Sequence, residues 1–239
     1  NRIEEHVQQA IRDESLWPNA LIQFNPNFEK GIGVGDMIAS GLPIHQDLSL
    51  FFNTSFYKHQ QEAITLGCQD KEFIVTSGTG SGKTECFLYP ILDYCYKCNK
   101  YSKKYGVKVI IMYPMNALAQ DQAKRIAEII WNDERLKDNV TAGLFIGEGQ
   151  NPKTYPTVMG EDHIIENRNA ILDSVPDIIL TNFKMLDYAL MKQTYQKLWK
   201  GNTGGQSQLR FIVLDELHTY DGAQGTDVAN LIRRLKLKL

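Results

Sequence analysis

The sequence has no long hydrophobic run and no surplus of positive charge. No stretch of its 239 residues approaches the ~20 apolar residues of a membrane-spanning helix, and its first residues show no signal-peptide pattern. We therefore expect a cytoplasmic protein without a membrane partner. The net charge of −2 argues against a module that holds duplex DNA by charge alone.

Cysteine is scarce as well, and the four copies fit reduced thiols in a cytosol. They are Cys68, Cys86, Cys95 and Cys98. The last two have the C-x-x-C spacing of zinc and redox sites, but no second such pair and no paired histidines follow. We favour packing or surface thiols over a metal or redox role for this pair.

The rest of the composition is that of an ordinary globular protein, 43% hydrophobic and 23% charged. From residue 56 onward, short β-rich apolar runs alternate with helical stretches. This alternation predicts an α/β fold, with a mostly parallel sheet and helices on both faces. In such sheets ligands bind at the carboxyl ends of the strands. The expected strands are 73–76, 107–113, 142–146, 177–181 and 211–214. The expected helices are 83–95, 116–131, 161–172, 183–191 and 226–239.

The chain divides into two parts by its pattern. Turn signals and short helical pieces fill residues 1–50, which we interpret as an accessory segment packed on a domain of residues 51–239. Three segments are expected to be loops: 97–106, 147–160 and 200–208. The lysines of the first of these loops favour a solvated surface over a nucleic-acid contact.

A glycine-rich loop follows the first expected strand. Residues 76–85 read Thr-Ser-Gly-Thr-Gly-Ser-Gly-Lys-Thr-Glu and lead into an expected helix, within which Pro90 should cause a bend or a break. Glycines let successive backbone N–H groups turn inward as an anion nest, to which the helix N-terminus adds its positive dipole end. Lys83 is placed to reach the β- and γ-phosphates and Thr84 to bind Mg²⁺, so the loop predicts a nucleoside triphosphate. The residues expected to hold it are Ser77, Gly78, Thr79, Gly80, Ser81, Gly82, Lys83, Thr84 and Glu85.

The loop departs from the common pattern at one position. Ser77 stands where G-x-x-x-x-G-K-[ST] has its first glycine. The alternative interpretation is a Gly/Ser/Thr-rich surface turn. The apolar run before the loop and the helical pattern after it favour the phosphate-binding interpretation.

An acidic pair ends the last expected strand. Asp215 and Glu216 follow the apolar run 211–214, far downstream of the glycine-rich loop. Asp215 is suited to hold Mg²⁺, mainly through water, and Glu216 to orient and deprotonate the water that attacks the γ-phosphate. The alternative is an acidic strand end that caps the next helix. The chain order of loop and acidic pair favours a shared catalytic site.

These residues together resemble a known family. The run Asp-Glu-Leu-His at 215–218 matches the DExH box of superfamily 2 helicases and translocases, and the resemblance covers most of residues 56–239. It implies a RecA-like P-loop NTPase lobe with a small helical N-terminal extension, in which His218 senses the phosphate state. The segment before the loop resembles the Q motif. Gln60 would then read the adenine edge, which favours ATP, and Tyr57 would stack on the ring; the alternative for Gln60 is an exposed helix residue.

Two further stretches resemble the family's strand-contacting motifs Ia and Ib. Pro114 and Asn116 lie in the first, where Met115 and Asn116 replace the usual Thr and Lys or Arg. Thr181 and Asn182 open the second. The resemblance implies that these residues contact the backbone of a nucleic-acid strand, and for Thr181 a helix N-cap is an alternative or additional role.

Within the superfamily, the chain is most similar to bacterial DExH DNA helicases of the mitomycin-repair (YprA-like) type and to helicases of phage defence. This implies an ATP-dependent motor acting on DNA, with a second RecA-like lobe that supplies arginine fingers and with other repair or defence proteins as possible partners. An RNA helicase and a non-catalytic scaffold lobe of a defence complex stay open as alternatives. We expect residues 1–239 alone to bind Mg-ATP weakly and to hydrolyse it poorly.

Overall fold

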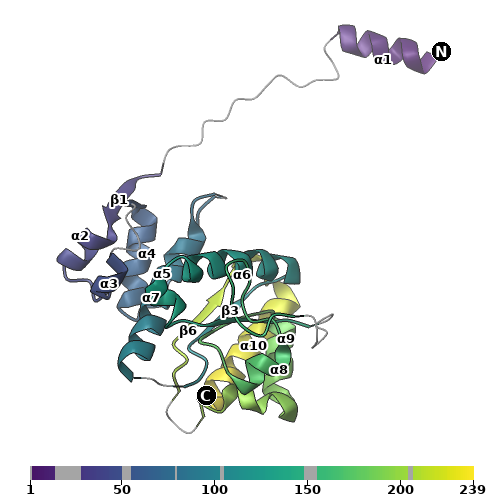
Figure 1. Ribbon diagram of the computed structural model, residues 1–239. Helices are drawn as coiled ribbons and strands as arrows, with labels where there is room; N and C mark the ends of the chain where they lie inside the picture. The colour runs from purple at the N-terminus through teal and green to yellow at the C-terminus, as the bar shows by residue number, and fades with distance from the viewer. Residues whose placement is uncertain are drawn as a thin grey trace.

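The protein is built around a four-stranded parallel sheet with the strand order β4-β5-β3-β6 (Figure 1). The computed structural model describes residues 2–13, 28–49, 55–78, 80–102, 105–147, 155–203 and 207–239. The strands are β3 (Val109–Met112), β4 (Ala142–Phe145), β5 (Ile178–Thr181) and β6 (Phe211–Leu214). Val109 lies opposite Ile178 on one side and Phe211 on the other, so the strands end together at one edge.

Helices cover both faces of the sheet. On one face lie α5 (Lys83–Lys97), α6 (Asn116–Trp131) and α7 (Glu134–Lys137). On the other lie α8 (Arg168–Asp173), α9 (Phe183–Met191) and α10 (Gly222–Lys238). Successive residues of β3 alternate between the two cores, as a strand buried on both faces requires.

Of the N-terminal elements, those after α1 (Arg2–Arg12) form a small layer against α5, whereas α1 lies apart from it (Figure 1). The elements of the layer are β1 (Lys30–Gly33), α2 (Val34–Ala39), α3 (Gln46–Ser49), β2 (Ser55–Tyr57) and α4 (Lys58–Cys68). β1 and β2 pair antiparallel, and α4 packs on α5. Val34, Met37 and Leu48 belong to the same buried cluster as the inner face of α5. Residues 34–48 therefore pack as a layer on the domain, whereas α1 has no buried residue.

The expected elements correspond closely to the observed ones, with four exceptions. α5 continues through Pro90, α8 covers only the end of the expected helix 161–172, and α10 begins at Gly222. The fourth exception is the run 73–76, which is not a strand. The expected loop 97–106 includes a π-helical turn at Cys98–Ser102, and a 3₁₀ helix spans Gln193–Trp199.

These exceptions have local causes. Pro90 is buried where α4 passes close, since a Cβ on Gly67 would lie 2.8 Å from its ring, so packing outweighs the lost helix hydrogen bond. The Asn167 side chain accepts hydrogen bonds from Asn169 N and Ala170 N and thereby sets the start of α8. The run 73–76 lacks a paired strand among the described residues, and Ile74 is 75% exposed.

The cysteines pack as expected for plain thiols. Cys86 and Cys95 are fully buried, and burial raises the pKa of Cys86 to about 11 and that of Cys68 to about 12. These thiols therefore stay protonated near neutral pH. Within the described ranges, no group of three or more histidine, cysteine or acidic side chains could hold a metal ion. None of the described helices is both long and apolar enough to cross a membrane.

Candidate active site

The glycine-rich loop turns sharply into the N-terminus of α5. Gly80 and Gly82 have positive φ angles of 76° and 74°, a region that favours glycine. The Lys83 side chain folds back over the loop, and its Nζ donates hydrogen bonds to Ser77 O (2.9 Å) and Gly78 O (3.2 Å). The ammonium group is thereby held within the curve of the backbone. Of the predicted loop residues, Thr79 lies outside the described part of the chain.

The serines brace the loop from inside. Ser77 Oγ and Ser81 Oγ lie 2.6 Å apart in a hydrogen bond, and Ser81 is buried. A serine at position 77 thus adds a hydrogen bond that a glycine could not make. The chain therefore compensates for the missing first glycine of the common pattern with a side-chain bridge.

Gln60 holds the loop from α4 instead of lying exposed. Its amide nitrogen donates to Gly82 O at 3.0 Å, its oxygen accepts from Tyr57 N at 2.9 Å, and its side chain is 6% exposed. The alternative of an exposed helix residue is wrong. The adenine contact stays a prediction, for which each amide atom retains one further hydrogen-bonding position.

An aromatic cluster lies beside this contact. Tyr57 stacks on His59 with ring planes 11° apart, and Phe28 packs on both rings at 5.3 Å between centroids. A nitrogen of the His59 ring lies 2.9 Å from Ser81 O, which connects the cluster to the glycine-rich loop. Phe28 and Tyr57 are 37% and 39% exposed, so their faces are accessible to a flat ring.

The first turn of α5 is tied to α6. Glu85 pairs with Arg125, and its second carboxylate oxygen is buried with no partner in the described structure. The carboxylate lies near the helix N-terminus, where the dipole favours a negative charge. A Cβ on Gly82 would lie 2.9 Å from Glu85 Oε2 and closer still to Gln60 Nε2. Thr84 is half-buried in the same turn.

The acidic pair lies at the end of β6, at the edge of the sheet where the parallel strands end. Asp215 N donates to Met112 O at 3.0 Å, and Glu216 N donates to Asp215 Oδ1 at 2.9 Å. Burial raises the pKa of the Asp215 carboxyl above its ordinary value, and the nearby positive charge of Lys83 opposes this rise. The carboxylate of Asp215 is therefore held at the end of β6, beside the end of β3.

Glu216 adopts a backbone conformation that is rare for its residue type. Its φ is 49° and ψ is 45°, in the left-handed region, which costs a non-glycine residue about 1–2 kcal/mol. His218 Nδ1 lies 3.4 Å from Glu216 Oε2, and the histidine is well exposed, at 77% of its side chain. The turn thus aims both side chains outward from the end of β6. Glu216 is the N-cap residue of the 3₁₀ turn Leu217–Thr219, but its side chain makes no capping hydrogen bond.

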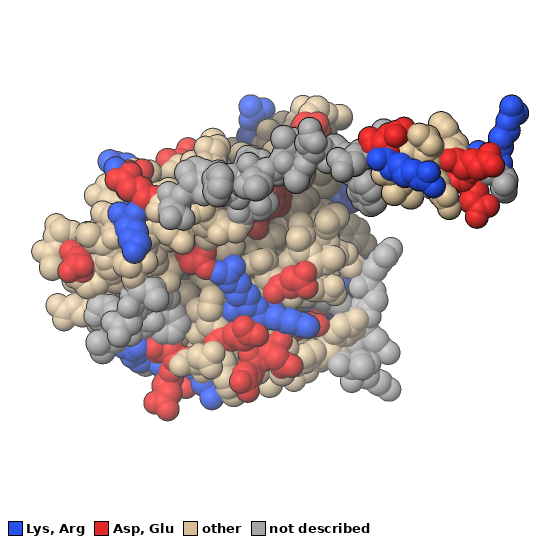
Figure 2. Space-filling view, turned by 90° about the horizontal axis from the view of Figure 1, so that it is seen from above, with Lys and Arg blue, Asp and Glu red and all other residues tan. Residues whose placement is uncertain are grey.

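The residues predicted for strand contact meet at the ends of β3 and β5. Asn182 Nδ2 donates to Asn116 Oδ1 at 2.7 Å, which joins the two motifs. Asn116 is exposed, and Pro114 beside it is half-buried. In the face seen in Figure 2, basic and acidic side chains are interspersed and form no broad basic patch.

Thr181 differs from its expected role. It is fully buried, and its hydroxyl donates to Phe145 O at 2.6 Å. In this structure Thr181 therefore does not offer its side chain to nucleic acid, because its hydroxyl donates to the backbone of the neighbouring strand β4. The N-cap of α9 is Asn182, whose side chain accepts from Met185 N at 2.8 Å, so the capping role lies one residue further on.

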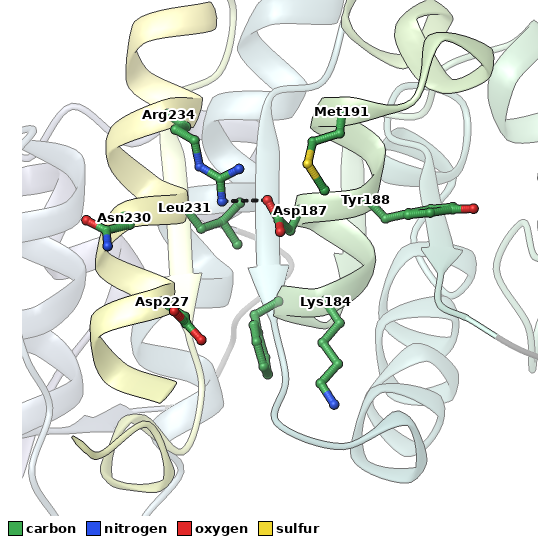
Figure 3. A pocket seen from close by; sticks show the side chains of 9 residues that line it. Lys184, Asp187, Tyr188, Met191, Asp227, Asn230, Leu231 and Arg234 are labelled. Atoms are coloured by element: carbon green, nitrogen blue, oxygen red, sulfur yellow. Dashed lines mark ion pairs between the residues drawn. The ribbon is translucent and has the colours of Figure 1, made fainter. Parts of the chain in front are cut away.

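A groove of about 580 Å³ lies between α9 and α10, apart from the phosphate loop. Figure 3 shows its lining, in which Arg234 and Asp187 pair across the gap at 2.5 Å. Lys184 and Asp227 lie toward the end of the groove near the start of the two helices, and Met191 is 63% exposed. The ion pair leaves the middle of the groove without net charge. A phosphate backbone would therefore find no electrostatic attraction there. None of the predicted site residues lines it.

Several neighbours of the site were not found from the sequence. His59 is part of the same short run as Gln60, so proximity in sequence was an available signal. Phe28 and Arg125 lie far along the chain from their partners, and no sequence pattern connects them. The hydroxyls of Tyr113 and Tyr220 are also buried, and burial raises the pKa of both. Only the folded structure reveals these contacts.

Comparisons with known proteins agree with this geometry. The sequence profile of the DEAD/DEAH box helicase family matches residues 57–239. The Druantia protein DruE of Escherichia coli (strain UMEA 4076-1) is 25% identical, over 98% of this chain and 19% of the relative. The uncharacterized ATP-dependent helicase YprA of Bacillus subtilis (strain 168) is 29% identical, over 75% of this chain and 20% of the relative.

A solved structure shares the fold. The DUF1998 helicase MrfA, crystallised with DNA and AMPPNP, superposes with a TM-score of 0.62 at 24% identity. The alignment covers 96% of this chain and 28% of that one. The chain spans about a fifth of the length of these curated relatives. The expectation of a RecA-like α/β lobe is confirmed.

Proposed function

The chain belongs to the DEAD/DEAH box helicase family, and from this premise we propose that residues 51–239 are the first RecA-like lobe of an ATP-dependent DNA helicase or translocase. Residues 1–50 are the accessory segment of that lobe. Membership of the family implies that the chain binds ATP. The observation that carries the proposal is the family match over residues 57–239, together with the hold of Lys83 Nζ on Ser77 O and Gly78 O inside the glycine-rich loop.

The nucleotide site uses groups from three elements. Backbone N–H groups of the loop and of the α5 N-terminus bind the phosphates, and Lys83 neutralises their charge. Thr84 and Asp215 hold Mg²⁺, which when bound neutralises charge that develops on the phosphate oxygens. Glu216 orients the attacking water and accepts its proton. His218 lies in the exposed turn that follows Glu216. From this position it senses a change in the phosphate state of the nucleotide and relays it to the outside of the lobe.

The adenine lies between Gln60 and the aromatic cluster. Gln60 already holds Tyr57 N and Gly82 O, so it ties the base-reading position to the phosphate loop. The ring face of Tyr57 or Phe28 supplies the stacking surface. This arrangement accounts for a preference for ATP, since an amide presents one donor and one acceptor to the adenine edge.

The second half of the active site belongs to another RecA-like lobe of the longer protein. Its arginines stabilise the charge of the transition state. The strand lies across Pro114, Asn116 and Asn182 and is gripped at its phosphates, a mode that by itself does not separate DNA from RNA. We favour DNA because MrfA is a helicase crystallised with DNA. The longer protein works in the cytoplasm in DNA repair or phage defence, with other proteins of those systems as partners.

The proposal is tested by ATP turnover in the full-length protein. We expect single-stranded DNA to stimulate hydrolysis more than RNA of the same sequence. Glu216→Gln should abolish stimulated turnover and leave nucleotide binding intact. Stronger stimulation by RNA would favour an RNA helicase, and a Glu216→Gln protein with wild-type turnover would favour a scaffold lobe. Asp173→Asn, at an exposed ion pair with Lys197, is the control.

A further inference from the structure

The first turn of α5 holds a buried carboxylate oxygen that has no hydrogen-bond partner among the described residues. Gly82 is the N-cap of α5, so Lys83, Thr84 and Glu85 are its first three helical residues. Glu85 Oε2 is the unpartnered oxygen, whereas Oε1 is paired with Arg125. A buried oxygen in this condition is unfavourable, because it has lost its hydrogen bonds to water and gained none in return. The placement of this side chain therefore needs an explanation beyond its own stability.

Glu85 lies beside the backbone N–H groups that are proposed to bind the phosphates. A Cβ on Gly82 would lie 2.9 Å from Glu85 Oε2, so this oxygen lies close to the α-carbon of Gly82. A glutamate at the third helical position commonly turns back to the N–H of the N-cap residue. The helix dipole that attracts this carboxylate is also the one that attracts phosphate. Two anions therefore compete for the N-terminus of α5.

Arg125 holds this carboxylate from the neighbouring helix. Its Nη2 donates to Glu85 Oε1. Arg125 belongs to α6, whose residues Ala123, Ile126 and Ala127 are buried in the same core as the inner face of α5. The packing of α6 thus fixes the base of the arginine side chain. Because the Glu85 side chain is only 24% exposed, solvent screens its charge in part, and Arg125 is the group that neutralises it.

We propose that Arg125 is a positioning residue for the phosphate loop, which holds the Glu85 carboxylate away from the phosphate-binding N–H groups and neutralises its charge. The inference rests on the proposed function, in which those N–H groups and Lys83 bind the phosphates of ATP. Arg125 acts through Glu85 and does not itself touch the nucleotide. Without Arg125, Glu85 is an unpaired negative charge that repels phosphate and is free to turn back onto the N–H of Gly82.

The test measures the affinity of the full-length protein for a fluorescent ATP analogue by equilibrium titration. Arg125→Met keeps much of the length of the side chain but removes its charge and its donors. It should lower the affinity about tenfold, because the charge of Glu85 is left unpaired beside the phosphates. The double variant Arg125→Met/Glu85→Ala should regain most of that affinity, because the competing anion is gone. A second change that restores binding also shows that the protein is folded.

A merely structural role for the ion pair predicts a different pattern. If the pair only ties α5 to α6, the double variant should bind as weakly as Arg125→Met, and that result would overturn the inference. Wild-type affinity in Arg125→Met would overturn it as well. Arg234→Met is the matched control, because Arg234 pairs with Asp187 between α10 and α9 at 2.5 Å with similar exposure. This pair lies apart from the phosphate loop, so its loss should leave the affinity unchanged.

Lys83→Ala separates the inference from the proposed function. If Lys83→Ala loses nucleotide binding while Arg125→Met keeps it, the positioning role fails and the proposed function stands. If Lys83→Ala binds the analogue as tightly as wild type, the loop does not hold the phosphates and both fail.

Discussion

At the scale of single residues, the phosphate loop depends on left-handed backbone conformations at two glycines, Gly80 and Gly82. Gly82 combines a φ of 74° with a position where a side chain would meet Gln60 and Glu85. Gly78, four residues earlier in the same loop, has open space around it. A side chain would therefore be accommodated at position 78 but not at position 82, although a sequence pattern treats the two glycines alike.

Gly82→Ala should lower the free energy of unfolding by about 1–2 kcal/mol, the cost of a left-handed conformation for alanine. It should also weaken nucleotide binding, because the carbonyl held by Gln60 and the N–H groups of the loop shift together. Urea denaturation measures the first effect and titration with an ATP analogue the second. Gly78→Ala is the control, and an equal loss of stability in both variants would contradict the argument.

Glu216 carries strain at the position proposed for the catalytic base. Glu216→Gly should be more stable than Glu216→Ala by about 1 kcal/mol, because glycine adopts the left-handed region without the Cβ penalty. Both variants should lose ATP hydrolysis. Denaturant unfolding compares their stabilities. Equal stability would mean that the turn after β6 relaxes when the glutamate is removed.

At the scale of elements, α9 begins at a residue with two tasks. The Asn182 oxygen caps the helix through Met185 N, while its nitrogen donates to Asn116 at the start of α6. The N-termini of α9 and α6 are thus joined by a single amide. Because the two tasks use different atoms of that amide, substitutions can separate them.

Asn182→Ala should cost about 1 kcal/mol of unfolding free energy, as loss of an N-cap typically does. Asn182→Asp keeps the capping oxygen and should retain most of that stability, but it removes the donor to Asn116 and adds a negative charge. Fluorescence anisotropy with labelled single-stranded DNA should then show weaker binding by the full-length protein for both variants. Wild-type DNA binding by Asn182→Asp would exclude this edge as a strand contact.

The N-terminal layer is attached to α5 and the π-helical turn by a network around Asp47. Its carboxylate accepts hydrogen bonds from Lys100 Nζ and Tyr96 OH, each at 2.6 Å. The hydrogen bond from Lys100, followed by that from Tyr96, lowers the pKa of Asp47 from 3.8 to about 2. Folding therefore favours the charged form of this side chain.

This shift predicts a pH dependence of stability. A depressed folded-state pKa contributes stability above the unfolded value of 3.8, and that contribution is lost as pH falls toward about 2. Asp47→Asn should therefore flatten the stability profile in this window. Urea midpoints measured from pH 2 to 7 provide the test, with Asp173→Asn as the control that keeps the wild-type profile. An unchanged slope in Asp47→Asn would refute it.

At the scale of the whole molecule, the two edge strands of the sheet, β4 and β6, differ in burial. Every residue of β3, β4 and β5 is buried, whereas all four residues of β6 are only half-buried. Among the residues that the structure describes, β6 pairs with β3 alone, and the run 73–76 that leads into the phosphate loop is not paired with it. The two halves of the nucleotide site thus come from segments that backbone hydrogen bonds do not join.

We propose above that a second lobe supplies the arginines of the active site. This proposal predicts weak catalysis by residues 1–239 on their own. Their ATP turnover should lie about 10³–10⁵-fold below that of the DNA-stimulated full-length protein, the range associated with a missing arginine finger. Steady-state ATPase assays on both proteins at equal concentration make the comparison. Robust DNA-stimulated turnover by the 239-residue chain would contradict the need for a second lobe.

Much of the fold was predictable because its signals are local. β6 and α9 have the expected bounds, since apolar runs and helical periodicity mark buried elements directly. The expected strand 73–76 is wrong because a strand also needs a neighbour for its backbone groups, and no local signal reports that. Thr181 was misjudged for a similar reason, since its burial depends on Phe145 of another strand.

The sequence by itself determined the family and was sufficient to predict the chemistry of the site. Gly82, Lys83, Asp215 and Glu216 were identified by residue type and order, because phosphate and Mg²⁺ binding demand those groups in few arrangements. Only the tertiary structure decided how they are supported. The hold of Gln60 on Gly82, the packing of the Phe28 ring and the pairing of Arg125 with Glu85 join residues far apart in the chain. Their contacts arise only when the sheet and its helices pack.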